Sequence, residues 1–224
     1  MDASQLVAAT ADYIRERMAH DASGHDWWHV HRVWQMARQL ASGEPVDMLV
    51  VELAALLHDI ADWKFHGGDE TAGPRAARLW LASQSADEPI IDHVCTIIAD
   101  LSFKGARVAT PTRTLEGAIV QDADRLDAMG AIGIARAFTY GGFRGRPLYD
   151  PACPPQLHDS FAAYQKKSGP TINHFYEKLL LLRDRLNTPA ARRMAAERHA
   201  YLEGFLRQFF AEWGTEPPQI TGCE

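Results

Sequence analysis

The segment from Met48 to Leu57 places the strongest constraint on the fold, because it is apolar nearly all round and is interrupted only by Glu52. A helix that is hydrophobic on every side is stable only where other elements cover it. Asp47 can cap such a helix at its start, and His58-Asp59 follows it directly. We therefore expect a central helix that ends in an imidazole next to a carboxylate.

The rest of the chain also follows the helical period, and alternating stretches rich in β-branched residues are nearly absent. We expect further helices at about residues 6–18, 26–40, 69–83, 89–101, 112–129, 131–138, 172–186 and 189–213. Residues 140–157 are rich in Gly and Pro, which predicts a long loop that could act as a lid. The last two helices bury too little surface to be stable alone, so we expect one all-α domain, 1–224, with this hairpin packed on the core.

The composition excludes several classes of function. The chain has 224 residues with 23 Lys and Arg and 29 Asp and Glu, which gives a formal net charge of −6. This charge argues against a nucleic-acid polymer or an anionic membrane as partner. The three cysteines are far apart, which fits a reducing compartment and excludes a thiolate zinc site. Signal-peptide features and a membrane-length apolar run are absent from the sequence, so we expect a cytoplasmic protein.

Histidine and aspartate occur together in three segments, at residues 25–31, 58–62 and 122–127. The second segment is the most informative, because an unpaired buried carboxylate is very costly and needs a cation, a donor or a metal. His58-Asp59 at the end of an apolar helix could therefore form a metal site with residues from neighbouring helices. From these residues alone, an ordinary helix end with His58 near the dipole and Asp59 in solvent stays an alternative.

The order of these segments resembles the HD-domain superfamily of metal-dependent phosphohydrolases. The signature is a His followed by Arg32-Val33, then Leu-Leu-His-Asp-Ile at 56–60 and Asp-Ala-Asp-Arg-Leu-Asp at 122–127. The small bacterial single-domain members are the most similar, through Gly-His-Asp-Trp-Trp-His at 24–29, Ser-Phe-Lys-Gly at 102–105 and Asn-His-Phe-Tyr-Glu-Lys-Leu at 173–179. The resemblance covers most of the chain. It implies a compact helical HD bundle with its core at about 20–130 and a C-terminal hairpin at 172–213.

The resemblance implies one metal site with four ligands, which are His29, His58, Asp59 and Asp124. His29 is preferred to His25 and His31 because it precedes Arg32-Val33 at the family's spacing. Asp124 is preferred to Asp122 because Ala-Asp-Arg-Leu is the family's usual context for the last ligand. Two imidazoles and two carboxylates suit one divalent ion, with Mn favoured and Mg, Ni, Co, Fe or Zn also compatible.

Cations near the ligands are candidate phosphate contacts, because a nucleotide carries several negative charges. Arg32 lies three residues after His29, and Asp127 lies one turn after Asp124, where it could bind substrate or orient a ligand. The resemblance adds Lys104 and Lys178. The candidate substrate-binding residues are therefore Arg32, Lys104, Asp127 and Lys178. We expect Asp62 to be catalytic, as a base or by orienting a ligand. For each of these residues an exposed or ion-paired side chain is the alternative.

The predicted function is hydrolysis of small nucleotides, specifically of a (deoxy)nucleoside triphosphate to a monophosphate and pyrophosphate. The alternatives are a phosphomonoesterase or phosphodiesterase of the same fold, a di-iron oxygenase and a non-catalytic nucleotide sensor. A di-iron site needs further histidines, and only His66 and His93 lie between His58 and Asp124. The expected partner is a small phosphorylated substrate, without a nucleic-acid polymer or a membrane, and a homodimer is compatible with the sequence. Among the other histidines, we expect His93 at the core edge and His20, His66, His158 and His199 at the surface.

Overall fold

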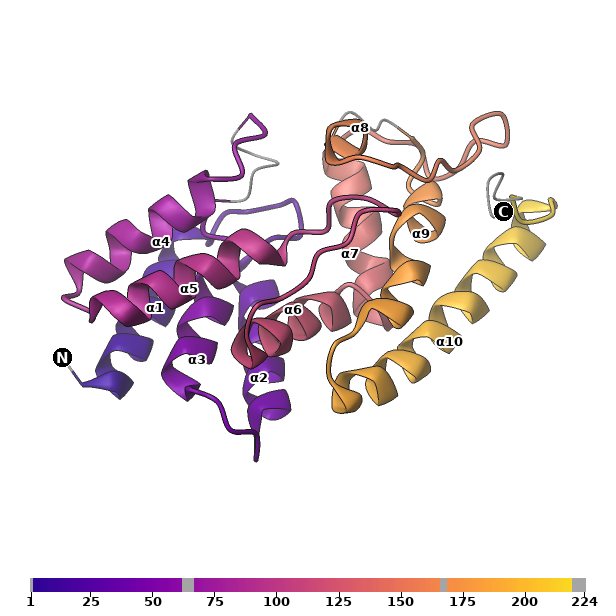
Figure 1. Ribbon diagram of the computed structural model, residues 1–224. Helices are drawn as coiled ribbons and strands as arrows, with labels where there is room; N and C mark the ends of the chain where they lie inside the picture. Colours follow the sequence, from indigo (N-terminus) through magenta and orange to yellow (C-terminus); the bar gives the residue numbers. More distant parts are fainter. Residues whose placement is uncertain (1, 62–66, 166–168, 219–224) are drawn as a thin grey trace. The chain divides into compact units, whose positions relative to one another are not determined.

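The computed structural model describes residues 2–61, 67–165 and 169–218, and within these ranges every regular element is a helix (Figure 1). This confirms the predicted all-α class. The chain forms two compact units, one made of Met1–Phe103 and Thr110–Asp124 and the other of Lys104–Ala109 and Arg125–Glu224. The single domain stays a prediction. In the described parts of the chain, no helix is both long enough and apolar enough to cross a bilayer.

Helix α3 (Met48–Leu57) is the central helix of the first unit, as its apolar sequence predicts. It packs against α1 (Ala3–Arg17), α2 (Trp27–Ala41) and α5 (Glu88–Leu101). Leu53, Leu56 and Leu57 are fully buried. The Asp47 carboxylate accepts hydrogen bonds from the backbone N–H groups of Leu49 and Val50, which is the predicted cap. Helix α4 (Ala72–Ser83) completes this group by packing on α5.

Helix α6 (Leu115–Asp127) contributes residues 115–124 to the first unit and 125–127 to the second. It is shorter than the expected span of 112–129. At its start, the hydroxyl of Thr114 accepts the backbone N–H of Gly117, as a capping residue does. Beyond its end, Gly130 has a φ of +68°, a left-handed conformation that favours glycine and turns the chain into the next helix.

The second unit is built from α7 (Gly130–Phe143), α8 (Phe161–Gln165), α9 (Asn173–Glu177), the 3₁₀-helix η2 (Leu179–Arg185) and α10 (Pro189–Trp213). Helix α10 packs on α7 and on η2. An aromatic cluster joins α7, α9 and α10, because the rings of Phe138, Phe175 and Phe205 lie with centroids 5.5 to 6.0 Å apart. These rings form the apolar centre of this unit.

Two boundaries in the second unit differ from the sequence prediction. Helix α7 continues to Phe143 through Gly141 and Gly142, which the sequence predicts to lie in the loop. Gly141 lies so close to Thr171 that a Cβ there would overlap the Thr171 hydroxyl, so glycine serves close packing here and not a turn. The expected helix 172–186 is interrupted at Lys178, whose φ of −144° and ψ of −60° are not helical.

The rest of the predicted loop is held by hydrogen bonds within the second unit. The backbone N–H groups of Thr171 and Ile172 donate to the carbonyls of Pro147 and Leu148, at 2.9 and 3.0 Å. The backbone N–H of Gln156 donates to the Glu177 carboxylate, at 3.1 Å. That this segment is a lid stays a prediction.

The histidine distribution corrects one expectation. His199, predicted at the surface, is only 7% exposed because it lies on the inner side of α10 with Ala195 and Leu202. Its Nε2 lies 3.3 Å from the Glu203 carboxylate. His66 lies outside the described residues.

Candidate metal centre

His29 enters the site from the first turn of α2. Asp26 is the N-cap of this helix, and its carboxylate accepts the backbone N–H of His29 at 2.9 Å. The cap fixes where the helix begins, and the buried side chains of Val30 and Val33 fix which side faces the core. His29 is therefore fully buried although it lies in the first turn.

His58 enters the site from the end of α3, where the sequence predicts it. Its Nδ1 lies 2.8 Å from the carbonyl oxygen of Ala55. Because a carbonyl can only accept, Nδ1 carries the proton, and the lone pair of a neutral imidazole is then on Nε2. This second contact orients the ring, as it commonly does for histidines that bind metals.

Four side chains meet at one point of the first unit. His29 Nε2 lies 3.2 Å from His58 Nε2 and 3.2 Å from Asp59 Oδ2. Asp124 Oδ1 lies 3.6 Å from His29 Nε2 and 3.9 Å from His58 Nε2. Donor atoms about 2.1 Å from one ion and at right angles to each other are about 3.0 Å apart, so these spacings fit a shared ion. The structure thus brings together all four predicted ligands, from α2, α3 and α6.

The chemistry of the cluster also fits a cation. Two imidazole nitrogens that face each other at 3.2 Å need a proton or a cation between them. Burial by itself would raise the pKa of Asp59. In the absence of a metal ion, the charge of His58 when its ring is protonated, a hydrogen bond from His29 and the charge of a protonated His25 outweigh burial and hold this pKa well below its ordinary value. Asp59 is therefore ionised at neutral pH, as a metal ligand must be.

The structure places the other predicted residues in varied surroundings. Arg32 is half-buried on α2, and Asp62 lies outside the described residues. The remaining three belong to the second unit. Lys104 has its ammonium 5.6 Å from the centre of the Phe161 ring, and the buried carboxylate of Asp127 forms an ion pair with the partly buried Arg136 at 3.2 Å. Lys178 lies at the break between α9 and η2.

Two neighbours of the cluster are not among the predicted site residues, although the sequence offers His25 as an alternative to His29. His25 has its ring 6.0 Å from that of His29, in an edge-on arrangement. Ser23 is fully buried, and its hydroxyl contacts the His25 ring. The signal that points to His25 is its position just ahead of the cap residue Asp26, four residues before His29.

His93 belongs to a different contact in the first unit. Its Nε2 lies 3.0 Å from the hydroxyl of Thr114 and 3.8 Å from the Glu116 carboxylate. His93 therefore links α5 to the start of α6.

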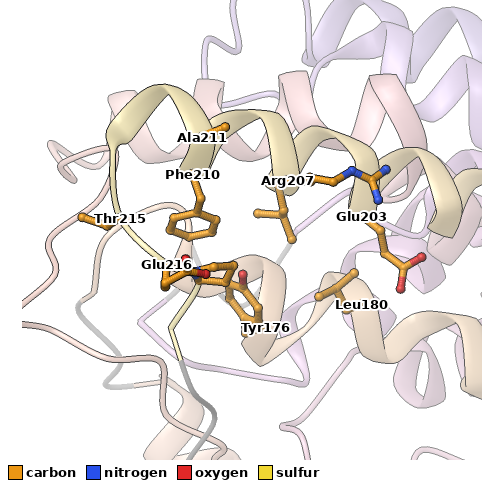
Figure 2. Close-up of a pocket in the computed structure, with 10 residues that line it drawn as sticks. Tyr176, Leu180, Glu203, Arg207, Phe210, Ala211, Thr215 and Glu216 are labelled. Carbon is orange, nitrogen blue, oxygen red and sulfur yellow. The ribbon is translucent and has the colours of Figure 1, made fainter.

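The second unit has a groove of about 510 Å³, with α10 along one side (Figure 2). Its lining is mostly apolar and includes Leu180, Leu206 and Phe210. Two charged residues, Glu203 and Arg207, also line it, and they lie one turn apart on α10. Burial raises the pKa of Tyr176, another lining residue, to about 12, so this phenol stays neutral at physiological pH. Of the predicted site residues that the structure describes, none lines the groove.

Comparison with known proteins identifies the family. The profile of the HD domain matches residues 27–129, a range that includes all four residues of the cluster. Protein YpgQ of Bacillus subtilis is 38% identical over 205 residues, which are 88% of this chain and 88% of YpgQ.

Solved structures agree with the sequence comparison. A protein of Lactobacillus plantarum has a TM-score of 0.85 and 39% identity, covering 96% of this chain and 98% of the other. An HD-superfamily hydrolase of Bacillus thuringiensis has a TM-score of 0.70 and 42% identity, covering 96% and 100%. YpgQ in complex with ADP has a TM-score of 0.68 and 35% identity, covering 90% and 97%. The chain belongs to the HD-domain family.

Proposed function

We propose that this protein is a metal-dependent phosphohydrolase that acts on small nucleotides. The observation that carries the proposal is the convergence of His29, His58, Asp59 and Asp124 in the first unit. The similar Bacillus thuringiensis protein is an HD-superfamily hydrolase, and YpgQ binds ADP in its crystal structure. These two relatives support hydrolysis as the reaction and a nucleotide as the ligand.

The four clustered side chains would hold one divalent ion, for which we favour Mn²⁺. Such an ion supplies charge neutralisation at a phosphoryl oxygen and lowers the pKa of a bound water toward neutrality. Two imidazoles and two carboxylates provide only nitrogen and oxygen ligands, which suits Mn²⁺ as well as Mg²⁺, Ni²⁺, Co²⁺, Fe²⁺ and Zn²⁺. The chain would contribute this ligand set by preorganisation, since Asp26 caps the helix that carries His29 and the Ala55 carbonyl orients the His58 ring.

The proposed substrate contacts are those that the sequence predicts, with Asp62 as the catalytic residue. A guanidinium can bind two phosphate oxygens at once, and an ammonium acts as a compact positive charge, so Arg32, Lys104 and Lys178 suit a polyphosphate. The Asp127 carboxylate would act indirectly, because its ion pair with Arg136 is already in place. We propose a (deoxy)nucleoside triphosphate as substrate, with a monophosphate and pyrophosphate as products, in the cytoplasm.

The test is a panel of nucleotides assayed with each divalent ion, with phosphate and pyrophosphate resolved by ³¹P NMR. We expect pyrophosphate from one or more nucleoside triphosphates, with the highest rate in Mn²⁺. His58→Ala is the control for a contaminating hydrolase, and we expect it to lose activity and Mn²⁺ binding while its helical circular dichroism is unchanged. Release of neither product from any nucleotide in any metal would contradict the proposal.

The same panel separates the proposed reaction from its alternatives. Phosphate as the first product indicates a phosphomonoesterase, and opening of cyclic nucleotides indicates a phosphodiesterase. Tight nucleotide binding without turnover indicates a sensor. Two iron atoms per chain with an oxidised-iron absorption band indicate a di-iron oxygenase.

A further inference from the structure

Three tryptophans of α2 gather around the ring of His31. The centre of that ring lies 5.6 Å from the centre of Trp27 and 5.8 Å from that of Trp28. It lies 6.0 Å from the centre of Trp34, in an edge-on arrangement that Trp28 shares. Trp27, His31 and Trp34 are half-buried, whereas the Trp28 residue is 61% exposed. Trp28 is thus the aromatic residue of this group that is most open to solvent.

The group is anchored to the neighbouring helix α3. Trp34 Nε1 donates a hydrogen bond to the Glu52 carboxylate at 3.2 Å. The Arg38 guanidinium lies 5.8 Å from the centre of the Trp34 ring and pairs with the same carboxylate at 3.1 Å. Trp34 is therefore held in place, and it supports His31, which contacts Trp28. A tryptophan side chain rotates about only two bonds, so an indole with such support can bind a flat ligand at a small cost in entropy.

Trp28 lies beside the proposed ligand cluster. It directly precedes His29, and Arg32 follows one turn later. Successive residues of a helix differ by about 100° in direction, so Arg32 lies about 60° around the helix from His29 and Trp28 about 100°, both away from the buried Val33. Burial follows the same order, because His29 is fully buried, Arg32 is half-buried and Trp28 is exposed. From the core to solvent, this part of α2 therefore presents a metal ligand, a guanidinium and an indole.

A nucleotide presents matching groups in the same order, with phosphates at one end and a flat base at the other. We propose that Trp28 stacks on the base of the nucleotide substrate. This inference rests on the proposed function, in which the metal centre and Arg32 bind the phosphates. Stacking on an aromatic side chain uses the face of a base, and every base has such a face. We therefore expect the protein to accept all the common bases, with purines preferred because their larger rings overlap the indole more.

Binding measurements test the stacking without turnover. ADP and pyrophosphate share two linked phosphates, and only ADP has a base. In calorimetry at a fixed Mn²⁺ concentration, we expect the wild type to bind ADP more tightly than pyrophosphate. Trp28→Ala should weaken ADP binding by about 10-fold or more, which is the usual effect of losing one aromatic–base stack, and should leave pyrophosphate binding unchanged. Trp28→Phe keeps an aromatic ring and should recover most of the ADP affinity.

Kinetics with nucleoside triphosphates and inorganic triphosphate give a second test. We expect Trp28→Ala to raise KM for the nucleotides by about 10-fold or more, with kcat nearly unchanged, because stacking far from the reacting bond stabilises ground state and transition state alike. The KM for inorganic triphosphate should stay constant, and the preference for purines should disappear. Tyr201→Ala is the matched control, because Tyr201 is 58% exposed and lies on α10, and this variant should match the wild type with every ligand.

The inference and the proposed function fail in distinguishable ways. Unchanged ADP binding in Trp28→Ala, or an equal loss for ADP and pyrophosphate, refutes the stacking, and hydrolysis of nucleotides by the same protein would leave the proposed function intact. A wild type that binds ADP through Trp28 but releases neither phosphate nor pyrophosphate from any nucleotide refutes the proposed function and supports the stacking. Because Trp28 is mostly exposed, thermal unfolding of both Trp28 variants should match the wild type.

Discussion

The two units hold their predicted functional residues in different ways. In the first unit, His29 and His58 are buried, and each has a hydrogen bond that ties it to a helix end. In the second unit, Lys104 belongs to a loop and Lys178 to a break between helices. The ligand cluster is therefore set by helix packing and capping, whereas the lysines depend on the conformation of irregular backbone.

One arginine organises the loop that contains Lys104. The guanidinium of Arg185 donates to the backbone carbonyls of Gly105, Ala106 and Val108, with distances to the first and last of 3.2 and 3.3 Å. Three carbonyls held by one side chain give this loop an anchor that local sequence does not provide. We therefore expect substitutions in the ligand cluster of the first unit to impair metal binding and hydrolysis, and substitutions in the second unit to raise KM.

The largest effect is expected from removing a proposed ligand in the first unit. Asp124→Ala should abolish Mn²⁺ binding in calorimetry and lower hydrolysis by more than about 10³-fold, because charge neutralisation by the ion is lost. Asp122→Asn is the control, since Asp122 lies two residues away and is fully buried. It should retain Mn²⁺ binding. Equal Mn²⁺ affinity in the two variants would show that the wrong aspartate has been assigned.

In the second unit, loss of the loop anchor should weaken substrate binding without affecting the metal. We expect Arg185→Ala and Lys104→Ala each to raise KM by about 10-fold, and the double variant to add little, because both act through one loop. Arg183→Ala is the control, since the Arg183 side chain is 47% exposed and its guanidinium pairs with the adjacent Asp184. Additive effects of the two substitutions would show that Arg185 and Lys104 do not act through one loop. A loss of Mn²⁺ affinity in either variant would show that the second unit also affects the metal.

The sequence predicts the first unit better than the second for a physical reason. The apolar surface of residues 48–57 requires a central helix, and the His58-Asp59 pair at its end follows from that placement. The role of Gly141 could not be predicted, because it depends on Thr171, a residue distant in the chain. The contact between Ser23 and His25 was missed for a similar reason, since it requires the positive φ of Gly24.

A smaller effect, on stability, tests the close packing in the second unit. Gly141→Ala should destabilise the protein by about 1–3 kcal/mol, because the new methyl group overlaps the Thr171 hydroxyl. Gly142→Ala is the matched control, since no atom lies within 4 Å of its Cβ position and alanine favours the helix by about 1 kcal/mol. Thermal unfolding should therefore shift in opposite directions. Mn²⁺ affinity should stay constant in both variants, and a change would link the packing of α7 to the ligand cluster.

The smallest effect is expected from changing a hydrogen bond that stabilises the start of α3 in the first unit. The carboxylate of Glu116 accepts the backbone N–H of Asp47, the cap of α3, at 3.0 Å. Burial would raise the pKa of Glu116, but this hydrogen bond, together with the charge of His93, lowers it below the ordinary value of 4.5. A lowered pKa in the folded state means that the ionised carboxylate stabilises the protein above pH 4.5 and that this contribution is lost as the pH falls through the folded-state pKa.

Glu116→Gln should therefore lower the free energy of unfolding by about 1 kcal/mol near neutral pH, because a hydrogen bond to a charged group contributes about 1.5–3 kcal/mol and one to a neutral group about 0.5–1.5 kcal/mol. The difference from the wild type should shrink as the pH falls below 4.5, because the wild-type carboxylate then becomes protonated and resembles the amide. Urea unfolding of both proteins across this range measures the difference. A difference that is constant with pH would mean that the shape of the side chain, and not its charge, supports the start of α3.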